Sequence, residues 1–276
     1  MRGRRQHELG IRESYKYSVT TIQNEFNSAG KVAALNSWAY YLGWDAAHAI
    51  VATRPNLDIA NEKAVKAVLR EEGLDLYSAQ TEAQNRGNAV HRALELYAKH
   101  GTIPAIGDAE ERDVPYFQGL AAFLIDAEPE FLSSETMVYS AKYDYCGTYD
   151  FRAALKRCSL VVDATSGARM EFGPGIYLGD AKTGKRIYAE ASAQLGGGYE
   201  GASIECGLTP TTEQIVVRFT DDGRYEVRKT WSSPEMFGAM VDAYRWIKKD
   251  REAQAKSEKE IAAVVKAHVA EMEIAA

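Results

Sequence analysis

The sequence predicts a protein of the α/β (α+β) class, with a central mixed sheet flanked by helices. Three observations carry this prediction. Helical hydrophobic spacing dominates the N-terminal half, short β-branched and aromatic segments follow, and a helix start at Ser233-Pro234 opens a long C-terminal helical stretch. We expect a basic tail at 1–17, a single domain at 18–248 with a helical part (18–128) and a sheet part (129–231), and a C-terminal helix at 232–276.

The expected helices of the first half are each bounded by recognisable residues. Thr20 or Thr21 can cap the first, Pro55 ends the second and Gly73 closes the third. The fourth carries a dense apolar stripe at helical spacing. Their expected ranges are about 20–27, 30–52, 58–71, 75–99 and 111–126.

The sheet part is expected to begin after Pro129. The stretch 164–175 has three glycines and a proline and suits a hairpin loop, and Asp221-Asp222-Gly223 is a strong turn signal. A short helix is expected over about 189–203. The expected strands are 135–141, 147–154, 158–163, 176–182, 213–219 and 224–230.

The composition is that of an ordinary globular chain. The 276 residues are 46% hydrophobic and 26% charged, and 33 Lys+Arg against 39 Asp+Glu give a net charge of -6. This charge excludes a wholly basic coat protein for nucleic acid, but not an enzyme with a carboxylate cluster beside a local basic groove. No apolar run is long enough to span a bilayer and the N-terminus lacks the apolar stretch of a signal peptide, so we expect a cytoplasmic protein with no membrane partner.

The candidate chemistry centres on Asp180 and Lys182. Residues two apart on a strand share a face, so Ile176 and Leu178 should cover core and the charged pair should emerge where that core ends. A carboxylate can hold a hard divalent cation, and a lysine beside it can orient or help deprotonate a water, or neutralise a phosphate. A plain same-face salt bridge, worth about 0–1 kcal/mol, is the alternative.

Two further segments carry possible metal ligands. Asp150 lies on the preceding expected strand. If the two strands are neighbours, its carboxylate and that of Asp180 converge, and they repel unless a cation or a proton intervenes. Asn88, His91 and Glu95 form a stripe on one helix, and a neutral imidazole is a common metal ligand. A strand-ending aspartate and a hydrogen-bonded helix histidine are the alternatives.

A fourth segment joins Gln194 to Tyr199 through three glycines. A glycine triplet inside a helix costs around 3 kcal/mol relative to alanine. Either another backbone approaches closely there or the helix ends at the triplet. Gly179–Lys185 matches most of a phosphate-binding loop, but Arg186 stands where Ser or Thr should bind magnesium, which argues against nucleotide hydrolysis.

In this order, the four segments resemble the RecB-type branch of the PD-(D/E)XK nuclease superfamily over about residues 84–202. The phage-encoded and CRISPR-associated exonucleases are the most similar members. The helical histidine motif falls on Gly87–Glu95, G-x-x-D on Gly147–Asp150, D-x-K-T-G on Asp180–Gly184, and the glutamine and tyrosine on Gln194 and Tyr199.

The resemblance implies a restriction-endonuclease-like core that binds one or two Mg2+ or Mn2+ ions. On that basis Lys182 positions or activates a water and Gln194 steadies Lys182 or the DNA backbone. The implied metal ligands are His91, Asp150, Asp180 and the carbonyl of Ala181, and the further candidates are Glu135, Glu95 and Tyr199.

The chain departs from the family in two places. Gln194 and Tyr199 are five residues apart instead of the usual four, so Tyr199 would face away from the glutamine unless the helix bulges. The three cysteines, Cys146, Cys158 and Cys206, cannot supply the four ligands of the iron–sulfur cluster found in the CRISPR-associated members. We therefore expect no iron–sulfur cluster.

These residues predict a metal-dependent DNA exonuclease that acts on linear single- or double-stranded DNA in phage recombination, repair or replication. A recombination or single-strand-binding protein is a candidate partner. The alternative is a catalytically inactive nucleic-acid-binding module of the same fold. A third hypothesis is a scaffold protein that forms a homo-oligomer through the apolar stripe of Ile261, Val264, Val265 and Val269, although a frayed tail fits this stripe equally well.

Overall fold

The computed structural model describes residues 17–26, 60–102, 111–188 and 190–275, together with residues 43, 52, 54 and 56–58. The helix expected over 30–52 therefore lies outside the described residues except for positions 43 and 52, as does the expected basic tail except for Tyr17. The N-terminal elements are β1 (Tyr17–Ser18), α2 (Val19–Phe26), α4 (Glu62–Glu71), α5 (Leu76–His100), η2 (Glu111–Asp113) and α6 (Val114–Ala127).

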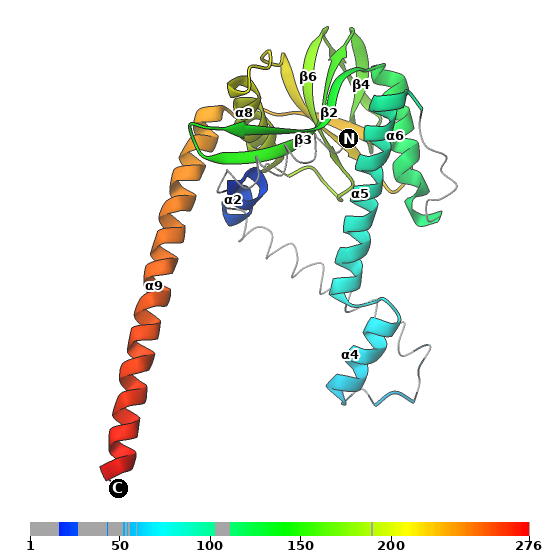
Figure 1. Cartoon of the computed structure of the whole chain (residues 1–276). Helices are drawn as coiled ribbons and strands as arrows, with labels where there is room; N and C mark the ends of the chain where they lie inside the picture. Colours follow the sequence, from blue (N-terminus) through cyan, green and yellow to red (C-terminus); the bar gives the residue numbers. More distant parts are fainter. Residues whose placement is uncertain are drawn as a thin grey trace.

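The remaining elements form the sheet part and the C-terminal helix. They are β2 (Glu130–Ser140), β3 (Tyr145–Leu155), β4 (Cys158–Asp163), β5 (Ala168–Phe172), β6 (Gly175–Lys182), α7 (Glu190–Ser192), η3 (Ala193–Tyr199), α8 (Glu200–Glu205), β7 (Glu213–Phe219), β8 (Tyr225–Lys229) and α9 (Pro234–Ala275). The predicted class is confirmed: a mixed central sheet is flanked by helices and followed by a long terminal helix (Figure 1).

Strand β3 is the centre of the main sheet. Antiparallel β2 pairs with one edge of β3 along most of its length. The other edge pairs with parallel β1 at Tyr145 and Cys146, and with antiparallel β6 from Phe151 to Leu155. Between these two partners, no strand of the described chain pairs with that edge. The gap covers Gly147–Asp150, where the sequence predicted a functional motif.

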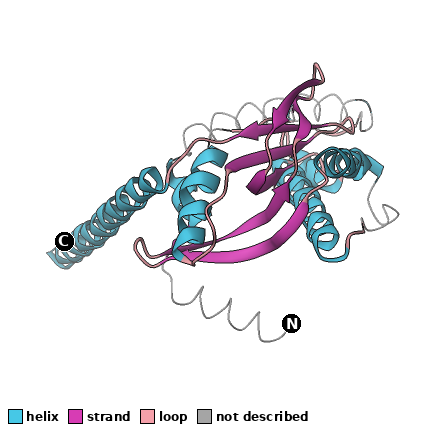
Figure 2. Cartoon of the chain, turned by 90° about the horizontal axis from the view of Figure 1, so that it is seen from above, coloured by secondary structure: helices cyan, strands magenta, loops and turns pink. Residues whose placement is uncertain are grey.

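Beyond β6 the sheet continues through β7, which is parallel to β6, and β8, which is antiparallel to β7. Helices cover both faces of this sheet (Figure 2). One apolar cluster joins the sheet to α5 and α6 and includes Leu94, Phe123 and Phe151. The other joins it to α2, η3 and the start of α9 and includes Ile22, Leu195 and Phe237. Helix packing on both faces fixes the edges of β3 and β6 in place.

The hairpin loop expected over 164–175 is wrong in its extent. Residues 168–172 form β5, which pairs antiparallel with β4 in a separate two-stranded sheet, and only the turn at 164–167 and the link at 173–174 are loops. The first four residues of β5 are exposed, so this strand lacks the alternating burial by which a strand is recognised in sequence.

Helix α9 is a single element of 42 residues. Its first turns pack on the sheet through Phe237 and Val241, and Arg251 forms a two-armed ion pair with Glu25 of α2, with distances of 2.9 and 2.5 Å. The rest of the helix projects from the body (Figure 1). Its apolar residues Ile261, Val264 and Val265 are exposed. A search of the described residues finds no helix that is long and apolar enough to cross a membrane.

Candidate metal centre

Three carboxylates occupy neighbouring positions on three adjacent strands. Pairing of Ser134 with Phe151 and of Thr136 with Tyr149 places Glu135 of β2 opposite Asp150 of β3. The ladder between β3 and β6 ends one residue before Asp150 would meet Asp180. The sheet thus brings Asp150 and Asp180 next to each other, and it adds Glu135 on the other side.

Asp150 sits where β3 leaves the ladder. Tyr149 packs into the cluster on one face of the sheet, whereas Phe151, two residues on, packs into the cluster on the other face, so the normal alternation is interrupted at this point. Where the backbone pairing between β3 and β6 stops, the Asp150 side chain links the two strands: its Oδ2 accepts a hydrogen bond of 2.6 Å from the backbone N–H of Ala181. The other oxygen, Oδ1, faces His91.

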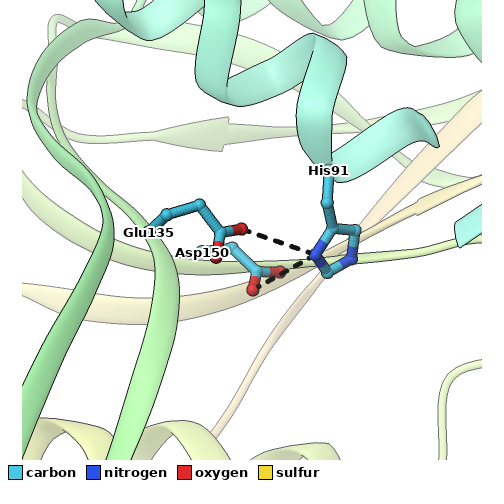
Figure 3. A group of neighbouring side chains, drawn as sticks. All are labelled: His91, Glu135 and Asp150. Atoms are coloured by element: carbon cyan, nitrogen blue, oxygen red, sulfur yellow. Dashed lines mark ion pairs between the residues drawn. The ribbon is translucent and has the colours of Figure 1, made fainter. Parts of the chain in front are cut away.

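Glu135 has a strained backbone. Its φ is +43°, in the left-handed region that residues other than glycine rarely adopt. The sequence placed this residue at the start of a strand, but it lies in the middle of β2. A positive φ inside a strand costs about 1–3 kcal/mol and is typical of functional sites, because the surrounding structure must hold it. The side chain points toward Asp150 and His91 (Figure 3).

His91 reaches the same place from α5. Its Nε2 is 2.9 Å from the carbonyl oxygen of Ala181, which can only accept, so Nε2 carries a proton and donates it. Its Nδ1 then faces Asp150 Oδ1 at 3.5 Å and Glu135 Oε1 at 3.7 Å (Figure 3). Burial lowers the pKa of His91, but Asp150, Glu135 and Asp180 outweigh it and raise the pKa to about 9.

These three residues pass a simple fit test for a cation. One ligand atom each from His91, Glu135 and Asp150 lies within 4.8 Å of the other two. Atoms at that separation can all reach one ion at the roughly 2.0–2.6 Å typical of Mg2+ and related cations. Two carboxylates and an imidazole therefore form a set of donors that suits a divalent cation.

Asp180, which is buried, forms an ion pair beside this set with the partly exposed Lys182. Asp180 is 1% exposed, and Lys182 Nζ lies 2.5 Å from its Oδ2. Among the described residues, no group makes a properly angled hydrogen bond to either oxygen of Asp180. Burial raises the pKa of Asp180 to about 6, with Asp150 adding to the rise and Lys182 opposing it. Such a carboxylate gains from a nearby cation.

The ammonium group of Lys182 is stabilised in its charged form. Burial lowers its pKa, but the charges of Asp180 and Asp150 outweigh burial, so that the pKa is raised. The sequence predicted that Leu178 covers core and that Asp180 and Lys182 emerge where the core ends. Leu178 is fully buried as predicted, but Asp180 still lies inside the core and only Lys182 reaches its edge.

A π-helix explains the five-residue spacing of Gln194 and Tyr199. The whole of η3 has π geometry, in which residues five apart face the same way, and Gln194 Nε2 donates a 2.7 Å hydrogen bond to Tyr199 Oη. Tyr199 packs directly over Gly147, where a Cβ would lie 2.5 Å from the tyrosine ring. Burial raises the pKa of Tyr199, so its hydroxyl stays protonated.

The glycine triplet lies inside this helix and does not end it. A Cβ on Gly196 would overlap the backbone oxygen of Ser232, one on Gly197 would overlap Phe237, and one on Gly198 would lie 2.7 Å from Val19. Of the two explanations left open by the sequence, a close approach is therefore correct, by the protein's own backbone at Gly196 and by its side chains at Gly197 and Gly198.

Glu95 lies outside the group. It forms an ion pair with Lys99, one turn further along α5. The group that could hold a metal instead contains Glu135, which the sequence offered only as a further candidate. Nothing in the sequence marks position 135 as a residue of positive φ, and the register of β2 against β3 is the only feature that places it beside Asp150.

No family model matches the sequence, and no curated protein matches it. The arrangement places three groups that could hold a metal ion between β2, β3 and α5, with a lysine ammonium and a buried carboxylate adjacent. It thus combines a site for positive charge with a hydrogen-bond donor at the rim of the sheet, which suits chemistry on an anionic substrate.

Proposed function

We propose that the protein is a metal-dependent deoxyribonuclease that hydrolyses phosphodiester bonds with one or two Mg2+ or Mn2+ ions, acting as an exonuclease. The observation that carries the proposal is the convergence of His91, Glu135 and Asp150 beside the Asp180–Lys182 pair. DNA as the substrate, attack from an end and a role in phage recombination, repair or replication in the cytoplasm rest on the four-motif resemblance. The geometry supports the metal and the lysine.

Each residue has a role that its surroundings support. A divalent cation would supply Lewis-acid chemistry here, lowering the pKa of a water and neutralising a phosphate. His91 Nδ1, Glu135 and Asp150 would hold it. The carbonyl of Ala181 accepts the proton of His91 Nε2 on the side of the ring away from Nδ1, so it would orient the imidazole and not share an ion with Nδ1. The buried charge of Asp180 makes the place more favourable for a cation.

Lys182 is better suited to donate than to accept a proton. Its raised pKa keeps the ammonium charged at neutral pH, so it can orient a water or hold a phosphate oxygen but not remove a proton. Gln194 is engaged with Tyr199, and the pair packs against the gap in β3 through Gly147. Tyr199, held by Gln194, therefore supports the part of β3 that carries Asp150.

The test is degradation of linear DNA in Mg2+ or Mn2+ by the unchanged protein and by three variants. Lys182→Ala and Asp150→Asn should each lower the rate by about 10²–10³, the loss typical when one charge-stabilising group is removed. Lys256→Ala, on the exposed part of α9, is the matched control and should keep full activity. Thermal melting checks that every variant is folded.

Three outcomes would count against the proposal. Undiminished cleavage by Lys182→Ala rejects the assignment of chemistry to this site. DNA binding without cleavage by the folded protein, under several divalent ions, leaves the inactive binding module instead. Self-association that disappears when residues 250–276 are removed, with no affinity for a metal, would favour the scaffold hypothesis.

A further inference from the structure

The backbone of the segment that follows Lys182 is anchored by two arginine side chains of the neighbouring strands β7 and β8. Arg218 Nη1 donates a 3.1 Å hydrogen bond to the carbonyl of Lys185, and Arg228 Nη1 donates a 3.2 Å bond to the carbonyl of Ile187. The Ile187 side chain is buried in the core cluster that contains Leu195. Because Arg218 pairs with Lys182 in the β6–β7 register, these anchors begin at the level of the candidate site.

Three side chains at and beside the anchored residues face solvent. Arg186 is exposed, and its guanidinium lies 4.7 Å from the centroid of the Tyr188 ring. Tyr188 is 45% exposed, so one face of its ring is open to a ligand. Lys185 is also exposed. The segment thus presents an aromatic ring and two positive charges on a fixed backbone.

The anchoring residue Arg218 is not itself available for a ligand. Arg218 Nε is paired at 2.9 Å with Glu226 Oε1, and both side chains are largely buried. Their charges cancel, so Arg218 serves to hold the backbone. In this segment the exposed positive charges are those of Lys185 and Arg186, with the Arg186 guanidinium over one face of the Tyr188 ring.

We propose that Lys185, Arg186 and Tyr188 bind an unpaired nucleotide of single-stranded DNA next to the scissile phosphate. The inference rests on the proposed nuclease function and adds the strand preference to it. Tyr188 would stack on the base while Lys185 and Arg186 contact the backbone phosphates. Six residues reach at most about 20 Å from Lys182, which is the length of a few nucleotides.

The chemistry favours a single strand over a duplex. Stacking needs an open face of a base, and inside a duplex both faces are covered by neighbouring bases. A tyrosine at this place therefore selects a single strand or a frayed end. Base stacking tolerates any sequence, because every base has an aromatic face, so no sequence preference is expected.

The test is binding of a short fluorescein-labelled oligodeoxythymidine, followed by anisotropy in Ca2+ in place of Mg2+. Tyr188→Ala should weaken binding by roughly 5- to 150-fold, the range for loss of one stacked base. Tyr188→Trp should restore the affinity and Tyr188→Leu should not. A blunt hairpin duplex should bind more weakly than the single strand and respond much less to Tyr188→Ala.

Tyr77→Ala is the matched control. Tyr77 is 74% exposed in the first turn of α5, about 21 Å along the helix axis from His91, and its loss should leave binding as it was. Equal affinity of Tyr188→Ala and the unchanged protein for the single strand overturns the inference, as does absence of binding by the unchanged protein. Normal binding that depends on Tyr188, without hydrolysis in Mg2+ or Mn2+, overturns the nuclease proposal alone.

Discussion

Magnesium and a proton should compete for Nδ1 of His91. With Nε2 donating to Ala181, Nδ1 is the nitrogen that faces Asp150 and Glu135, and it is protonated when the pKa is about 9. At pH 7 about 99% of the metal-free protein then carries this proton. Expelling it costs ~3 kcal/mol at pH 7, which corresponds to roughly a 100-fold loss of metal affinity.

The affinity for Mg2+ should therefore rise about ten-fold per pH unit from pH 7 and level off above pH 9. Titration calorimetry measures this directly, and repeating it at pH 7 in buffers of different ionisation enthalpy should show about one proton released per ion bound. A histidine with a raised pKa stabilises the metal-free fold below its ordinary pKa and loses that effect as the pH rises through about 9. Stabilisation by added Mg2+ should accordingly be larger at pH 9 than at pH 7.

Two variants make the result specific to this residue. His91→Gln removes the titrating group, so the pH dependence should flatten over the same range. His100→Gln changes an exposed histidine at the end of the same helix and should behave like the unchanged protein. A flat pH profile in the unchanged protein, or metal binding without proton release at pH 7, would refute the reasoning.

Three further predictions concern the supports of the site. Gly147→Ala would push a methyl group against Tyr199, so we expect the free energy of unfolding to fall by about 1–3 kcal/mol and DNA cleavage to slow. Each kcal/mol should lower the Tm by about 2–4 °C, and an unchanged Tm would contradict the packing. Glu135→Gly and Glu135→Ala should weaken Mg2+ binding equally. In urea unfolding the Glu135→Gly variant should be about 1 kcal/mol more stable than Glu135→Ala, because only glycine adopts the positive φ without strain; equal stability would count against that strain. Glu200→Ala should cost about 3–5 kcal/mol, because it leaves the buried Arg152, 4.0 Å away, without its carboxylate and Thr211 N–H without its acceptor. Urea unfolding measures that loss, and a loss below about 1 kcal/mol would show that the pair is solvated.

The elements of the fold were predictable where a local signal was strong. The α5 helix ends at Gly101 in the left-handed conformation and begins at Asp75, whose side chain caps it, and both features are visible in the sequence. Strand β5 was missed because its residues are mostly exposed. The joining of β1 to β3 was also not predictable, since a pairing of two residues between distant segments has no local signal.

The site was predictable in part for the same reason. The alternation of β6 places Asp180 and Lys182 on one face, and the order of strands suggests Asp150 as a neighbour. The position of Glu135 depends on a backbone angle, and the reach of Asp150 to Ala181 depends on the point at which β3 leaves β6. Both are properties of the assembled sheet. Sequence periodicity does not record them.

The spacing of Gln194 and Tyr199 shows how a departure from a motif can itself carry information. In an α-helix, residues five apart point about 140° away from each other, so the motif would be broken. The glycines between them let Ser232, Phe237 and Val19 approach, and the helix there takes up one more residue per hydrogen-bonded turn. A Cβ at any of the three glycines would lie 2.4–2.7 Å from Ser232, Phe237 or Val19, so the triplet is what lets this segment pack so closely. The π geometry of the same segment keeps the glutamine and tyrosine together, at 2.7 Å, despite their five-residue spacing.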